Sequence, residues 1–313
     1  MSSNCTLRPL LPYPDAVAQK YIFPPQACAA ILVIYFSLRR LYEQTIRNVG
    51  RFSISMIAVC EFLLLMCFIP LHLATHTTFN NWPLYREFYQ YNMVNIFSMT
   101  NLISALQSFF LVAVVIEFYL FTKNSTLTKV AIYAIIILFA ITVTSYNFVQ
   151  FKMVLIQNCN VVPMFNQNLA KYISIYKLNV MQYVITVCLP SIVVLVVNHR
   201  LARCIRQKSL LPSECKELIN EPCTDIGAQD RILRYISMLT VCFVVPHLLS
   251  FIPFAFDNYQ SGGQITYPPH ILKMMSFANA ALHQLTVASK TAIFFLLCRI
   301  SVDLSKLGVV NVY

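Results

Sequence analysis

The stretch FSISMIAVCEFLLLMCFIPLHL, residues 52–73, contains one formally charged side chain, Glu61, among apolar and small neighbours. About 20 residues of this kind are enough to cross the hydrocarbon core of a bilayer as a helix. The same pattern recurs along the chain, at residues 22–38, 93–121, 130–148, 178–197, 232–256 and 271–298. The sequence therefore predicts an all-α membrane protein built as a bundle of seven transmembrane helices.

The composition agrees with this prediction. Hydrophobic residues make up 58% of the chain and charged residues 11%, whereas an average soluble domain has about 25% charged residues. These numbers argue against a soluble globular enzyme and against a disordered chain. The net charge of +11 on so apolar a chain favours a lipid bilayer as the partner, and we expect no binding to nucleic acid.

The basic residues predict the orientation of the bundle, because cytoplasmic loops are enriched in Lys and Arg. Most of the 23 Lys and Arg residues lie on one side of the predicted spans, in residues 39–51, 122–129, 199–231 and after 299. We therefore expect 1–21 to be an extracellular tail, 22–298 to be the bundle and 299–313 to be a short cytosolic tail. Asn4-Cys5-Thr6 is then a glycosylation site on the outer side, whereas Asn124-Ser125-Thr126 lies in the cytosol.

Several landmarks in these spans resemble those of rhodopsin-like (class A) G-protein-coupled receptors. The second span has Glu61 where that family usually has aspartate, followed by leucines and Pro70. The third span ends in Glu117-Phe118-Tyr119, which is similar to the family's acid-Arg-Tyr motif. Further matches are Trp82 in the first outer loop, Pro190 in the fifth span and Pro246 in the sixth. The resemblance covers the whole chain and is closest to divergent invertebrate chemosensory and peptide receptors.

The sequence also departs from that family. Phe118 replaces the motif arginine, and Val244 stands in place of the tryptophan before the proline of the sixth span. Residues 290–294, Lys-Thr-Ala-Ile-Phe, stand where the family has Asn-Pro-x-x-Tyr, and 295–299 lead into a predicted short amphipathic cytosolic helix. The usual cysteine at the outer end of the third span is absent.

The resemblance implies a plasma-membrane receptor that transmits the binding of an extracellular ligand to a heterotrimeric G protein. Thr100 stands where amine receptors place an aspartate, so we expect a peptide or a small chemosensory ligand rather than a biogenic amine. No cofactor or metal is implied. The residues expected to line the ligand pocket are Thr100, Asn101, Ser104, Gln182, Thr186, His247, Phe251, Asn279, His283 and Gln284. Each polar side chain among them is also compatible with a simple hydrogen bond between helices.

Glu61, Glu117 and Lys290 are ionisable groups at membrane depth, where such groups are costly and mark functional sites by default. In the family alignment Glu61 and Lys290 face each other, which suggests an ion pair that acts either as a switch or as a structural link. Only four positions separate Lys290 from Phe294, a register that argues against a retinal-binding lysine.

The inner ends of the third and sixth spans are the expected G-protein interface. Because Phe118 replaces the arginine, Glu117 lacks its usual local partner, and we expect it to reach Arg231 or Arg234. The interface would then comprise Glu117, Phe118, Tyr119, Arg231 and Arg234.

The second outer loop, residues 149–177, has two apolar runs around Gln157-Asn158-Cys159-Asn160, which predict a β-hairpin with its turn at 158–160. Cys159 could form a disulfide with Cys5, or both could remain free thiols.

Other classes of protein remain to be weighed. A membrane transporter or channel, or a non-signalling receptor-like protein, is the main alternative, although no internal repeat is visible and the chain has only five glycines. His72 and His76 have the spacing seen in membrane di-iron enzymes, but the other histidines are scattered, so we do not expect an enzyme.

Overall fold

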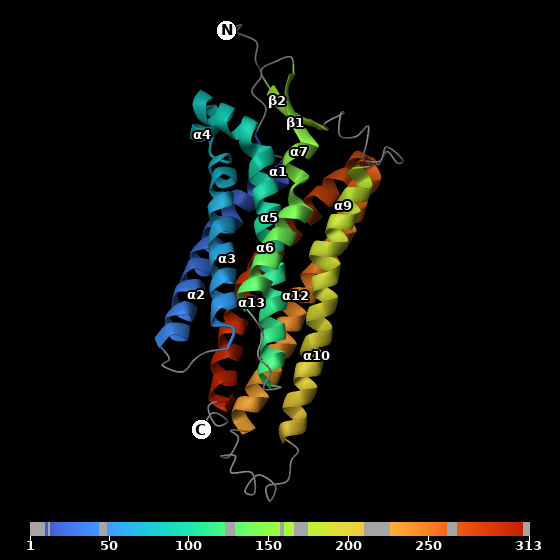
Figure 1. Cartoon of the computed structure of the whole chain (residues 1–313). Coiled ribbons are helices and arrows are strands. Elements are labelled where there is room, and N and C mark those ends of the chain that lie inside the picture. The colour runs from blue at the N-terminus through green and yellow to red at the C-terminus, as the bar shows by residue number, and fades with distance from the viewer. Residues whose placement is uncertain are drawn as a thin grey trace, which may run out of the picture.

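The structure is a computed structural model, which describes residues 10–11, 13–43, 49–122, 129–156, 160–165, 175–209, 226–261 and 268–308. In this part of the chain, seven helices are long and apolar enough to cross a membrane. They run side by side as a bundle (Figure 1). Each of the seven predicted spans falls on one of these helices, so the prediction is confirmed for their number and apolar character.

The elements follow the predicted order, with short irregular pieces between the long helices. The first three spans comprise α1 (Tyr13–Val17), η1 (Ala18–Ile22) and α2 (Phe23–Glu43), then α3 (Arg51–Leu73), then α5 (Pro83–Thr122) after the short α4 (Thr77–Asn81). The fourth and fifth comprise α6 (Lys129–Thr144) with α7 (Asn147–Gln150), and α9 (Ile175–Tyr183), η2 (Val184–Cys188) and α10 (Leu189–Ser209). The last two are α12 (Ile226–Ser261) and α13 (Pro269–Gly308).

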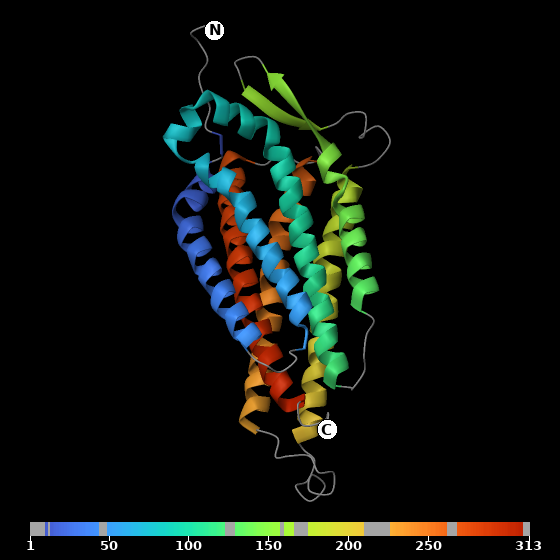
Figure 2. The same cartoon turned by 60° about the vertical axis from the view of Figure 1, so that its left-hand side comes forward.

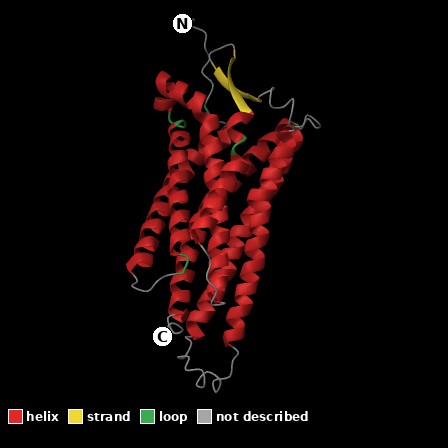
Figure 3. Cartoon of the chain, viewed as in Figure 1, coloured by secondary structure: helices red, strands yellow, loops and turns green. Residues whose placement is uncertain are grey.

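A two-stranded antiparallel hairpin covers one end of the bundle (Figures 2 and 3). Strand β1 (Phe151–Ile156) pairs with β2 (Asn160–Phe165), from Phe151 opposite Phe165 to Ile156 opposite Asn160. This confirms the two strands of the predicted hairpin, whereas the turn at 157–159 lies outside the described residues. The strands follow α7 directly and contact α5, so the hairpin lies above the ends of the fourth and third spans.

Burial divides the bundle into a core and a lipid-compatible rim. The most buried spans are α3, α5 and α13, whereas the first and fifth spans are the least buried. Large apolar side chains such as Leu138, Leu195 and Leu248 are exposed on the outer faces. Since lipid tails are as apolar as leucine, such faces are favourable in a bilayer and would be unfavourable in water.

The two ends of the predicted bundle need correction. The first helix begins at Tyr13 rather than at residue 22, and its π-helical segment η1 lies just before Pro24 and Pro25, which lack the N–H of a regular helix. At the other end, α13 continues to Gly308 without a separate amphipathic helix, and residues 300–305 are all buried. Contacts with the segment before α3 explain this burial, because Ser301 donates a hydrogen bond to the Val49 carbonyl (2.5 Å) and the Val49 N–H donates to Ser305 Oγ (3.3 Å).

Candidate functional site

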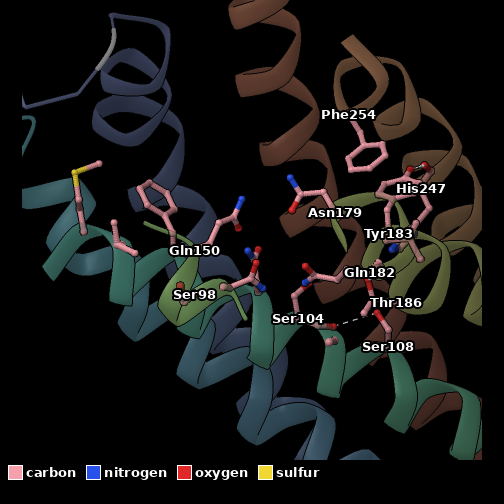
Figure 4. Close-up of a pocket in the computed structure, with 17 residues that line it drawn as sticks. Ser98, Ser104, Ser108, Gln150, Asn179, Gln182, Tyr183, Thr186, His247 and Phe254 are labelled. Carbon is pink, nitrogen blue, oxygen red and sulfur yellow. Dashed lines mark hydrogen bonds between the residues drawn. The ribbon is translucent and has the colours of Figure 1, made fainter. Parts of the chain in front are cut away.

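A cavity of about 520 Å3 lies between α5, α7, α9, η2 and α12, in the half of the bundle that is nearer the hairpin (Figure 4). Its size falls within the range of about 300–1,000 Å3 that is usual for small-molecule sites. The described residues that line it are Met93, Val94, Phe97, Ser98, Asn101, Ser104, Ala105, Ser108, Asn147, Gln150, Asn179, Gln182, Tyr183, Thr186, Val187, His247 and Phe254.

The lining is polar but carries no formal charge among the residues described. Hydroxyl and amide groups from Ser98, Ser104 and Ser108 face those of Asn179 and Gln182 across the cavity (Figure 4). Polar groups in the interior of a membrane bundle are costly unless they are paired or functional. A large polar cavity between helices is therefore the strongest candidate site in the described chain.

Tyr146 holds two of the amide side chains that line the cavity, those of Asn179 and Gln182. Its hydroxyl lies between two side-chain oxygens, Asn179 Oδ1 (2.9 Å) and Gln182 Oε1, and its single O–H is shared between these two acceptors. The fourth span is thereby joined to the fifth, since Tyr146 lies between α6 and α7 and both amides belong to α9. With the amide oxygens bonded to Tyr146, the amide N–H groups of Asn179 and Gln182 remain as donors.

The fifth span is wound as a π-helix where it reaches the cavity. Thr186 and Val187, which line the cavity, belong to η2 and lie just before Pro190. Proline lacks an N–H, and its ring clashes with the carbonyl four residues earlier, which is that of Thr186. The wider turn accommodates this clash, and π-helical turns within helices frequently occur at functional sites.

Tyr183 joins the fifth span to the sixth. Its ring stacks on Phe254 of α12, with centroids 4.0 Å apart and planes 15° from parallel, and its hydroxyl donates to the His247 carbonyl (3.0 Å). The His247 ring is held in turn by Nδ1 at 2.5 Å from the Phe243 carbonyl. A ligand that contacts Tyr183 and His247 would therefore act on the packing of α9 against α12.

The cavity is linked to two buried charges in the middle of the bundle. Lys290 Nζ on α13 donates a hydrogen bond to Ser104 Oγ, a lining group of α5 (2.6 Å). Glu61 on α3 is 1% exposed and accepts hydrogen bonds from Gln107 Nε2 (2.6 Å) and from Thr291 Oγ1 (2.9 Å). Through these contacts the wall of the cavity is connected to α3, α5 and α13.

The predicted direct ion pair between Glu61 and Lys290 is wrong for this conformation. Although both residues are described, no contact within ion-pair distance joins them, because Gln107 and Thr291 occupy the carboxylate while Ser104 occupies the ammonium. The two charges are still close enough to interact electrostatically. Both residues therefore belong to one buried cluster with Gln107, Thr291 and Ser104, although they do not pair directly.

Half of the residues predicted for the pocket lie in it. Asn101, Ser104, Gln182, Thr186 and His247 line the cavity. The other five do not: Thr100 bonds to the Ile96 carbonyl, Phe251 is 53% exposed on the outside of α12, Asn279 is exposed, His283 packs on Phe68, and Gln284 bonds through its carbonyl to Gln26. Three of these five, Asn279, His283 and Gln284, belong to α13, which contributes no residue to the described lining, and a contact of the five with a ligand stays a prediction.

Sequence reasoning missed the contribution of the fourth span. Asn147 and Gln150 line the cavity from α7, although both follow a strongly apolar stretch and looked like its outer end. Asn147 is 7% exposed, and its Nδ2 has no hydrogen-bond partner among the described residues. Two polar residues directly after an apolar span were the available signal. The other missed polar residues of the lining are Ser98, Ser108, Asn179 and Tyr183.

The expected G-protein interface is only partly at the surface. Glu117 is buried and accepts hydrogen bonds from Ser53 Oγ (2.6 Å) and from the Tyr133 hydroxyl, whereas Arg231 Nε lies 3.8 Å from Asp303 Oδ2. The expected contact of Glu117 with Arg231 or Arg234 is therefore not made in this conformation. Phe118 is 1% exposed and belongs to the core. Tyr119 is half-buried, and Arg231 and Arg234 are exposed at the end of α12.

The remaining predicted residues, Asn4, Cys5 and Cys159, lie outside the described residues. Within the described ranges, no three His, Cys, Asp or Glu side chains are grouped closely enough to hold a metal ion. The chain matches no known family model, and no curated protein is significantly similar to it. Its function is therefore inferred from the pocket and the bundle themselves.

Proposed function

We propose that the chain is a seven-helix receptor of the plasma membrane, similar to rhodopsin-like G-protein-coupled receptors, which binds an extracellular ligand in the polar cavity and transmits this binding to a heterotrimeric G protein. The observation that carries the proposal is the contact of Lys290 with Ser104, because it joins the wall of the cavity to a buried charge. A site that only bound a ligand would not need this connection.

The lining indicates the chemistry of the ligand. Every polar group that is described around the cavity is a hydroxyl, an amide or an imidazole, and no carboxylate is among them to pair with an ammonium group. The N–H groups of Asn147, Asn179 and Gln182 favour a ligand with hydrogen-bond acceptors, such as the carbonyls of a peptide or an oxygenated small molecule. A biogenic amine does not fit this set of groups.

The buried cluster of Lys290, Glu61 and their hydrogen-bond partners supplies a route by which ligand binding changes the packing of the helices. A ligand that bonds to Ser104 competes with Lys290 for the hydroxyl, and Lys290 then needs another acceptor in the core. Glu61 is the nearby anion, and its present partner Thr291 is the residue after Lys290 on α13. A ligand shifts such an equilibrium only by binding one arrangement better than the other, and competition for Ser104 provides that difference.

A reporter assay tests the proposal. The full chain is expressed in cells with a promiscuous G-protein reporter and exposed to libraries of peptides and small chemosensory molecules. For any ligand found, we expect Asn147→Leu and Gln182→Leu to lower potency by about tenfold or more, a loss of about 1.4 kcal/mol or more in binding. The matched control is Leu248→Ala, which changes a side chain on the exposed outer face of α12 outside the cavity and should leave potency unchanged.

Two outcomes would contradict the proposal. Silence towards all ligands, with normal surface expression, would favour a transporter or a receptor-like protein that does not signal. Equal losses of potency in Leu248→Ala and Gln182→Leu would show that the cavity is not where the ligand binds.

A further inference from the structure

A second, smaller cavity lies between α2 and α13, at the end of the bundle away from the hairpin. Its volume is about 140 Å3, and Phe36, Ser37 and Arg40 of α2 face Phe295 and Arg299 of α13 around it. The two helices pack together, and α13 continues beyond the end of α2 at this end of the bundle (Figures 1 and 2). This cavity is separate from the polar pocket, with which it shares no residue.

The charge around this second cavity is one-sided. Two guanidinium groups, those of Arg40 and Arg299, line a space of only about 140 Å3, and no acidic side chain is among its described lining. The nearest acids along the two helices have other partners, since Glu43 bonds to Arg39 (2.5 Å) and Asp303 lies against Arg231 (3.8 Å). Two like charges in one small cavity repel each other unless an anion lies between them.

The rest of the cavity is apolar, and part of it opens towards lipid. Phe36 is 59% exposed and Phe295 is 37% exposed, whereas Ser37 beneath them is buried. Arg299 lies over the Phe295 ring, 5.0 Å from its centroid. A guanidinium on a ring still presents N–H donors at its edge, so Arg299 can bind an anion while it contacts the ring.

The position of the arginines agrees with the surface of a bilayer. Arg40 lies one helical turn before the end of α2 at Glu43, on the side where the basic loops predict the cytosolic leaflet. Two tyrosines of the same helix, Tyr35 and Tyr42, are exposed near these arginines, and Tyr is enriched at the boundary between lipid and water. The ligand that meets two arginines and two exposed rings at this depth is an amphiphile with an anionic head.

We propose that this cavity binds an anionic phospholipid of the adjacent leaflet, with its phosphate held between Arg40 and Arg299 and its acyl chains lying along Phe36 and Phe295. Basic pockets between membrane helices on the cytoplasmic side are suited to anionic headgroups. The inference rests on insertion of the seven helices into a bilayer and does not depend on signalling.

Native mass spectrometry tests the proposal on the full chain reconstituted in nanodiscs of phosphatidylcholine that contain a minor fraction of phosphatidylinositol phosphate. We expect an anionic lipid to stay bound after release from the nanodisc. Since each arginine near the membrane surface contributes about 1 kcal/mol, Arg40→Gln and Arg299→Gln should each weaken retention about fivefold, and the double variant roughly 25-fold. The matched control is Arg39→Gln, because Arg39 is the adjacent exposed arginine, pairs with Glu43 and does not line the cavity.

A second measurement places the lipid and keeps the test decisive. A photoactivatable anionic lipid should crosslink to the peptides that contain Phe36 and Phe295 in the unchanged chain, but not in the double variant. If the double glutamine variant does not fold, Arg40→Lys with Arg299→Lys replaces it, because lysine keeps the charge but loses the bidentate geometry and should still weaken retention.

Three outcomes would overturn the proposal. Equal loss of lipid in Arg39→Gln would indicate diffuse surface charge rather than this cavity. Displacement of the lipid by inorganic phosphate at low concentration would indicate a site for a free anion. Retention of anionic lipid in the double variant, with crosslinks unchanged, would place the lipid elsewhere.

Discussion

Gly50 is in close contact with Phe118, the middle residue of Glu117-Phe118-Tyr119 at the end of the third span. Its φ of +73° lies in the left-handed region, and a Cβ added there would come within 3.1 Å of Phe118 Cε1. Phe118 is 1% exposed and belongs to the hydrophobic core of the bundle. Where an arginine would need a polar partner, the aromatic ring needs close packing, and a residue without a side chain allows it.

We therefore expect Gly50→Ala to destabilise the chain. The left-handed conformation costs an L-residue roughly 1–2 kcal/mol, and the contact with the Phe118 ring adds to this cost. The measurement is the melting temperature of the purified chain in detergent. Gly227→Ala is the control, because Gly227 is exposed within α12, where alanine is favoured by up to about 1 kcal/mol. Equal melting temperatures for Gly50→Ala and the unchanged chain would refute this packing argument.

At the scale of single residues, the sequence indicates which groups matter better than it indicates their partners. Glu61 and Lys290 stand out because charges are rare in apolar spans, and both are indeed in the core. Their partners Gln107, Thr291 and Ser104 were not predictable, because contact across helices depends on how each helix is rotated in the bundle. The same limit explains why Glu117 meets Ser53 rather than an arginine of the sixth span.

At the scale of elements, the spans were predictable and their ends were not. Length and apolar composition define a span regardless of its neighbours. The end of α13 depends on its neighbours, because the polar residues Ser301 and Ser305 are buried only through their bonds to Val49. Pro190 marked an irregularity in the fifth span, but whether the helix kinks or widens into η2 depends on what it packs against.

The buried cluster that joins α3, α5 and α13 gives a prediction for these elements. Lys290→Met should sharply reduce stability, because it leaves Glu61 as an uncompensated buried charge, at a cost of about 3–5 kcal/mol. Adding Glu61→Gln should restore much of the loss, since glutamine keeps the shape and an acceptor for Thr291 without the charge. Surface expression and melting temperature of the two single variants and the double variant form the complete cycle.

The outcome that would contradict this coupling is additivity. If the double variant is as unstable as the sum of the single variants, the two charges do not stabilise each other. The stabilising partners would then be only Ser104 for Lys290, and Gln107 and Thr291 for Glu61.

At the scale of the whole molecule, the apolar composition and the basic excess have separate structural roles. The apolar residues form both the core and the exposed outer faces, which accounts for a hydrophobic share of 58%. The position of the pocket was predicted only in its general half of the bundle, because the place of the fourth span beside the third and fifth is a tertiary property. Most of the basic residues lie in the loops on one side of the spans. This position predicts that the same side of the bundle faces the cytosol, which can be tested.

Two glycosylation sequons, at Asn4 and Asn124, provide the test of orientation with an internal control. Both lie outside the described residues. Three candidate spans separate them, so a chain that crosses the bilayer with each span has Asn4 and Asn124 on opposite sides of the membrane. Since N-glycans are added only on the lumenal side, we expect Asn4→Gln to abolish the mobility shift produced by glycosidase treatment and Asn124→Gln to leave it unchanged.

The reverse result would invert the bundle, so that the polar pocket would face the cytosol and the cavity of Arg40 and Arg299 would face the outer leaflet. Both the receptor proposal and the lipid proposal would then fail, because each depends on the side of the membrane that its site faces.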